Sequence, residues 1–100
     1  MSRTSDLHIG IDLGTTNSVI TYLRDGRPVP IVIDGDAICA EVGSPKVLNV
    51  ALIGAAAATG ALGLTLDQIE QALRKSMRPK LVDMNIQALH AGARAAARGL

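Results

Sequence analysis

Large aromatic side chains are almost absent from this sequence of 100 residues, which has no Phe, no Trp and a single Tyr. Aromatic residues ordinarily supply much of the buried area of a small core. Here aliphatic side chains and many alanines must fill it, so packed helices should approach each other closely. At 48% hydrophobic residues, the composition is still too apolar for a disordered chain. We therefore expect one small folded unit.

Cysteine and excess charge are also scarce. Cys39 is the only cysteine, which excludes a disulfide framework and a cysteine-ligated zinc site and fits a reducing, cytoplasmic setting. A net charge of +1 gives no reason to expect nucleic acid or a membrane surface as a partner. The first residues lack the apolar core of a signal peptide. The Ala-rich run after residue 47 favours a buried helix over a membrane span.

The first third of the chain carries strand and turn signals. Three runs rich in β-branched residues are bounded by turn residues: Leu7–Asp12, Ser18–Leu23 and Val29–Ile33. Asp25-Gly26 between the second and third runs is a strong hairpin signal. Pro28 and Pro30 place the third strand at an edge of the sheet. These signals predict an antiparallel β-meander.

Helix signals follow. Residues 37–43 are expected to form a short helical turn, and three longer helices are predicted over residues 45–59, 65–76 and 79–98. Ser44-Pro45 combines a capping hydroxyl with a proline at the first helical position, and Thr65 with Gln68 forms a capping box. Gly54 lies in an all-apolar helix that a neighbour could approach closely. The predicted fold class is α+β, a three-stranded antiparallel meander followed by and packed against two or three α-helices.

Polar residues within these helices have structural explanations. Asn49 and Asn85 are expected to cap or cross-link buried backbone. His8 and His90 are far apart in the sequence and have no neighbouring partner, so surface positions are expected for both. No residue is assigned a catalytic role.

One motif carries recognisable chemistry, the turn "GIDLGTTNS" between the first two strands. Gly14 allows a tight turn that an anion can approach closely. The backbone N–H groups of Thr15, Thr16 and Asn17 could then form an anion-binding nest. Asp12 at the strand end could hold Mg²⁺ through water. The alternative is a simple hairpin loop.

Residues 8–33, "HIGIDLGTTNSVITYLRDGRPVPIVI", resemble the N-terminal phosphate loop of the seventy-kilodalton heat-shock chaperones (the DnaK type), in the actin-like ATPase family. The resemblance implies that residues 14–17 contact ATP phosphates and that Asp12 lies near the metal. The second phosphate loop, the adenosine segment and the catalytic lysine of that family have no counterpart in this sequence. We therefore expect weak Mg-ATP binding at most, and no hydrolysis.

Residues 37–98 resemble the C-terminal part of the gamma-type subunit of 2-oxoacid:acceptor (pyruvate or indolepyruvate:ferredoxin) oxidoreductases. The segments that carry the resemblance are "GSPKVLN", "LIGA", "LTLDQIEQAL" and "PKLVDMNIQALHAG". The resemblance implies an enzyme that oxidises 2-oxoacids to acyl-CoA with thiamine diphosphate and iron–sulfur clusters and passes electrons to ferredoxin. In such an enzyme this segment helps to hold the assembly together and contributes to the coenzyme A region.

The two resemblances predict a hybrid of segments 1–36 and 37–100 that share one core, with a junction near residues 34–40. The favoured function is a structural module that does not catalyse a reaction in isolation. Two alternatives stay open: a Mg-ATP or phosphate-binding module, and an interaction subunit of a 2-oxoacid ferredoxin oxidoreductase. The expected partners are accordingly ATP, other oxidoreductase subunits, or a second copy that associates through apolar helices.

Overall fold

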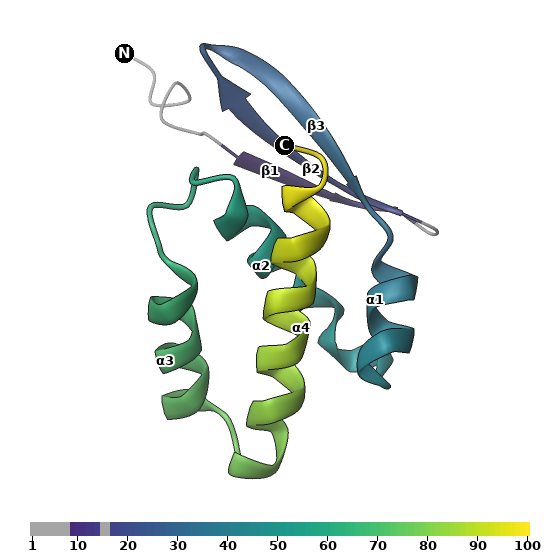
Figure 1. The fold of residues 1–100 in the computed structure, drawn as a ribbon, viewed down its shortest axis with the longest axis vertical. Helices are drawn as coiled ribbons and strands as arrows, with labels where there is room; N and C mark the ends of the chain where they lie inside the picture. Colours follow the sequence, from purple (N-terminus) through teal and green to yellow (C-terminus); the bar gives the residue numbers. More distant parts are fainter. Residues whose placement is uncertain (1–8, 15–16) are drawn as a thin grey trace.

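A computed structural model describes residues 9–14 and 17–100, which form a three-stranded sheet with helices on one side (Figure 1). The strands are β1 (Ile9–Leu13), β2 (Ser18–Arg24) and β3 (Arg27–Ile33). They are antiparallel in the order β1-β2-β3. Asp25 (φ 53°) and Gly26 (φ 77°) both adopt positive φ, as the tight hairpin turn between twisted strands requires. The predicted meander is confirmed, with the proline-bearing strand at an edge.

In the described part of the chain, the helical region contains four α-helices, where the sequence predicted two or three and a short turn. In chain order it consists of α1 (Gly35–Val42), a 3₁₀ turn η2 (Pro45–Val47), α2 (Leu48–Ala58), α3 (Leu66–Ser76) and α4 (Pro79–Ala97). The expected turn over residues 37–43 is a complete helix, because Asp34 caps it by accepting from the Ala37 N–H at 3.0 Å and Gly43 ends it with φ 95°. The Asp34-Gly35-Asp36 run is therefore a helix start.

Of the other two predicted caps, the one at Thr65 starts an α-helix and the one at Ser44 starts a 3₁₀ turn. Ser44 accepts from the Lys46 N–H, but the first turn is 3₁₀ and the α-helix starts only at Leu48. Thr65 and Gln68 form the predicted capping box, with reciprocal bonds of 3.1 and 2.8 Å. None of the helices in the described part of the chain is long and apolar enough to cross a membrane.

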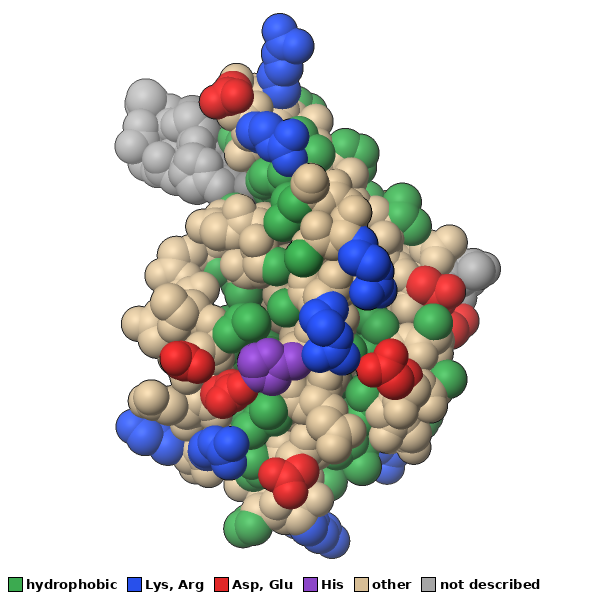
Figure 2. Space-filling model, viewed as in Figure 1, with side chains coloured by type: hydrophobic (Ala, Val, Ile, Leu, Met, Phe, Trp, Pro, Cys, Tyr) green, Lys and Arg blue, Asp and Glu red, His purple; other side chains and the backbone are tan. Residues whose placement is uncertain are grey.

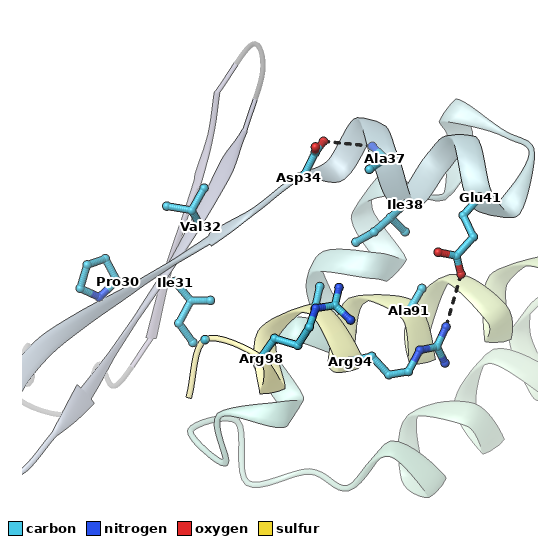
Figure 3. A pocket seen from close by; sticks show the side chains of 12 residues that line it. Pro30, Ile31, Val32, Asp34, Ala37, Ile38, Glu41, Ala91, Arg94 and Arg98 are labelled. Atoms are coloured by element: carbon cyan, nitrogen blue, oxygen red, sulfur yellow. Dashed lines mark hydrogen bonds and ion pairs between the residues drawn. The ribbon is translucent and has the colours of Figure 1, made fainter.

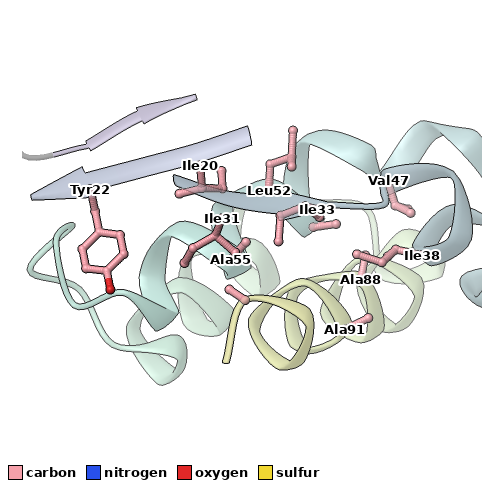
Figure 4. Close-up of a cluster of buried hydrophobic side chains, with 12 residues drawn as sticks. Ile20, Tyr22, Ile31, Ile33, Ile38, Val47, Leu52, Ala55, Ala88 and Ala91 are labelled. Carbon is pink, nitrogen blue, oxygen red and sulfur yellow. The ribbon is translucent and has the colours of Figure 1, made fainter. Parts of the chain in front are cut away.

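The core lies between the sheet and the α2–α4 pair (Figure 4). Alternate residues of β2 and β3 point toward the helices, so Ile20, Ile31 and Ile33 are buried. Tyr22 extends this row toward the hairpin end and is also buried. Aliphatic side chains and alanines thus fill the core, as the composition predicted.

Glycines let α2 and α4 pack backbone against backbone. A Cβ on Gly54 would overlap the carbonyl oxygen of Leu89, and a Cβ on Gly92 would overlap that of Ala51. The close approach predicted for Gly54 is confirmed, and Gly92 is its counterpart on the facing helix. Nearby, Asn85 is buried and donates to the Leu81 carbonyl at 2.9 Å, as expected for a satisfied polar group.

Candidate functional site

The predicted phosphate loop joins β1 to β2, and part of it can be placed. Thr15 and Thr16 lie outside the described residues, as does His8. Asp12, Gly14 and Asn17 are exposed, and a Cβ on Gly14 would overlap the Asn17 carbonyl oxygen. Glycine is therefore required by the turn itself. The described residues include no group of three or more His, Cys, Asp or Glu that could hold a metal ion. Binding of Mg-ATP at this loop stays a prediction.

A concavity lies where β3, α1 and α4 meet (Figure 3). It has a volume of about 460 Å³. Ile31, Ile38 and Ala91 line it with apolar surface, and Arg94 and Arg98 bring two guanidinium groups. Glu41 on α1 pairs with Arg94 across the concavity at 3.4 Å. Both side chains are mostly exposed, so this pair contributes little to stability.

A second hollow of about 430 Å³ shares Glu41 and Arg94 and extends along α4 to His90. His90 in turn pairs with Glu70 of α3. Figure 2 shows the histidine on this face with acidic and basic side chains on either side. Sequence reasoning missed the pair, because Glu70 and His90 belong to different helices and only tertiary packing brings them together.

Some of the charged side chains in these two hollows pair with side chains of neighbouring helices. Glu41 pairs with Arg94, which lowers the capacity of both hollows for an anion. Cys39 is half-buried and donates weakly to the Pro45 carbonyl. Burial and then the nearby Asp36 raise the pKa of the Cys39 thiol, so it stays protonated at neutral pH and is a poor nucleophile.

Asn49, for which a capping role was expected, is exposed.

The outer face of the sheet is an apolar surface that no described element covers. It is formed by the β2 and β3 residues that alternate with the core residues: Val19, Thr21, Leu23, Pro28, Pro30 and Val32. Val32 is 63% exposed and Leu23 is 40% exposed. An antiparallel sheet that faces water ordinarily carries polar residues on that face. An apolar outer face therefore indicates an interaction surface.

The fold and these surfaces describe a small α+β module with an apolar outer face on its sheet. The sequence profile of the pyruvate ferredoxin/flavodoxin oxidoreductase family matches residues 10–95, and the chain belongs to this family. No solved structure matches the chain.

The similar proteins are named indolepyruvate oxidoreductase subunit IorB. The Archaeoglobus fulgidus protein is 29% identical over 76 residues, which cover 76% of this chain and 38% of that protein. The Thermococcus kodakarensis protein is 35% identical over 66% of this chain and 33% of its own length. The Pyrococcus horikoshii protein is 33% identical over the same shares. The chain thus spans about a third of the length of these relatives.

The oxidoreductase resemblance is confirmed, and the family match begins well before residue 37. It covers the β-meander and runs without a break through residues 34–40, where the sequence suggested a junction. The resemblance of residues 8–33 to chaperone ATPases gains no support from the comparisons. The division of the chain at residue 36 stays a prediction.

Proposed function

We propose that this chain is a non-catalytic interaction module of an indolepyruvate-type 2-oxoacid oxidoreductase. The family match over residues 10–95 supports the enzyme class. The names of the similar proteins support indolepyruvate as the substrate of the assembly and identify them as subunits. The chain contributes contacts, and the reaction belongs to the assembly.

The cofactor chemistry of such enzymes agrees with this division of labour. Iron–sulfur clusters are held by several cysteine thiolates, whereas this sequence has one cysteine. Cys39 is half-buried with a raised pKa, and thiolates bind metal. A single protonated cysteine does not fit an iron–sulfur cluster. Electron transfer would depend on other subunits.

The observation that carries the proposal is the apolar outer face of the sheet. Val32 lies at one end of this face beside Val19 on the neighbouring strand, and Pro30 and Pro28 continue the face along β3 with rigid apolar surface. A partner subunit that covers this face would remove apolar area from water, which is the main favourable term in association. The module would therefore bind through the side of the sheet opposite its helices.

The test is complex formation between the purified chain and the other subunit of an indolepyruvate oxidoreductase, followed by light scattering and calorimetry. We expect a complex that Val32→Lys weakens by about tenfold or more, because the interface would bury an unpaired ammonium. Leu81→Lys is the matched control, since Leu81 is also an exposed apolar residue but lies on α4. It should leave binding unchanged.

Two results would contradict the proposal. If the unmodified chain forms no complex, the proposed function is wrong. A complex that Leu81→Lys weakens and Val32→Lys leaves intact would show that binding uses the helical side.

A further inference from the structure

The two edges of the sheet are protected differently. β3 has Pro28 and Pro30, which cannot donate a hydrogen bond to an incoming strand. β1, with the sequence IGIDL, contains no proline or lysine, and no strand among the described residues pairs with its second edge. Unprotected edge strands are templates for pairing with another strand, and soluble proteins commonly block them. Among the residues that the structure describes, one edge of this sheet is blocked by prolines and the other is unpaired.

The prolines also indicate which backbone groups face the open edge. Because Pro28 and Pro30 cannot donate to β2, the β2–β3 ladder must use the alternate residues of β3, which pair with Ser18, Ile20 and Tyr22. The intervening residues of β2 then bond to β1, at Gly10 and Asp12. By the same alternation, the backbone N–H and C=O groups of Ile9, Ile11 and Leu13 point toward the open edge.

The side chains of β1 are also incompletely covered. Ile11 pairs with Ile20 and Leu13 pairs with Ser18, so both point to the helical side of the sheet. Ile20 and Ser18 are buried there, but Ile11 is 47% and Leu13 is 59% exposed. The apolar row therefore extends past the helices to the edge of the sheet.

We propose that a second copy of this chain pairs antiparallel with β1, on a two-fold axis at Ile11, and joins the two sheets into one of six strands. Ile11 then faces Ile11 of the second copy, and Ile9 faces Leu13 of the second copy. The three apolar side chains of each strand meet apolar side chains on the same face, as cross-strand pairing favours.

The charge pattern favours this register over symmetric pairing about Asp12. On the outer face, Asp12 lies opposite Gly10 of the second copy, so the carboxylates do not face each other. Symmetric pairing one residue further along, about Asp12, would place the two carboxylates side by side, which is destabilising. Pairing about Ile11 thus keeps the carboxylates apart and all three apolar side chains of β1 matched.

This association uses a different element from the one that the sequence suggested. The apolar helix α2 was expected to mediate self-association, but seven of its eleven residues are buried within the chain. The inference is also independent of the proposed function, because it uses the edge of the sheet and leaves the outer face free.

The primary test is sedimentation velocity of the purified chain over a wide concentration range. Five-residue strands bury less area than a standard stable interface, so we expect a reversible dimer with a dissociation constant on the order of micromolar or weaker. Ile11→Pro removes an N–H that faces the open edge and should weaken the dimer by about tenfold or more. Val32→Pro is the matched control, because it removes an outward N–H from the other edge and should leave the dimer unchanged.

A charge pair at Gly10 tests the register without a proline. A Cβ at Gly10 would meet no atom within 4 Å, so the fold should accept a side chain there. Gly10→Lys should tighten the dimer roughly threefold or more by facing Asp12 of the second copy, and Gly10→Asp should weaken it by a similar factor. These variants decide the matter if circular dichroism shows that Ile11→Pro does not fold.

A chain that is monomeric at every concentration would overturn the inference. So would a dimer that is indifferent to both Gly10 variants, or a β1 edge that pairs only with a strand of another oxidoreductase subunit. A chain that dimerises through β1 and binds no such subunit would leave this inference standing and overturn the proposed function.

Discussion

Helix α4 packs against two neighbours in two different ways. Toward α2 it presents Gly92, and the two backbones touch with no side chain between them. Toward α3 it presents Leu89, which packs with Ile69, the single buried residue of α3. In the described residues, no side-chain ion pair joins α2 to α4, whereas the contact with α3 includes the partly exposed pair between Glu70 and His90. The difference indicates that α2–α4 is the centre of stability and that α3 can open separately.

Gly92→Val should have the largest effect on this comparison. The new side chain would overlap the Ala51 carbonyl of α2, and neither helix backbone can move away without separating the core. We expect a loss of at least about 3 kcal/mol in the free energy of unfolding, a large share of the stability of a small domain. Urea denaturation measures it.

Gly10→Ala is the control for that change, because a Cβ at Gly10 meets open space. Its free energy of unfolding should stay within about 0.5 kcal/mol of the original. Similar stabilities for the two variants would show that α2 and α4 are not in backbone contact.

Gly92 also shows how far sequence reasoning reaches. The sequence predicted that Gly54 permits close packing, because it lies in an all-apolar run, and that prediction was right. Gly92 makes the matching contact, but its partner Ala51 is remote in the sequence, so no local signal identifies it. Local signals such as the Thr65 capping box could be recognised in advance. The Glu70–His90 pair and the concavity at Arg94 could not be recognised in advance, because both depend on how the helices pack.

The loop between β1 and β2 shows the limit of what a short sequence motif can establish. A short motif between strands suggested ATP, but the glycine at its centre has a local reason, since a Cβ on Gly14 would overlap the Asn17 carbonyl. A turn and a phosphate site place similar demands on sequence. The family match over residues 10–95 covers this segment together with the helices, a range that no single motif could establish.

Ile69→Ala should separate α3 from the rest of the molecule. The truncation removes the one buried anchor of α3 from the cluster with Val50, Ala57 and Leu89. We expect a loss of about 2 kcal/mol, at the lower end for a buried isoleucine because the site is at the margin of the core. Hydrogen exchange should accelerate in α3 while α2 and the facing part of α4 stay protected.

Leu73→Ala offers a comparison on the same face, since Leu73 is only partly buried. Its effect should be smaller and in the same direction. If Ile69→Ala instead accelerates exchange throughout α2 and α4, the three helices open as one unit and α3 is not peripheral.

Thr65→Ala should have the smallest effect of the three. It removes the hydroxyl that accepts from the Gln68 N–H at 3.1 Å and leaves the first turn of α3 without its cap. The expected loss is about 1 kcal/mol, and it should appear as faster exchange at the first turn of α3. Thr65→Ser keeps the hydroxyl and should restore protection. A Thr65→Ser variant that exchanges as fast as Thr65→Ala would mean that the threonine methyl group, through packing, holds the start of α3 in place of the capping box.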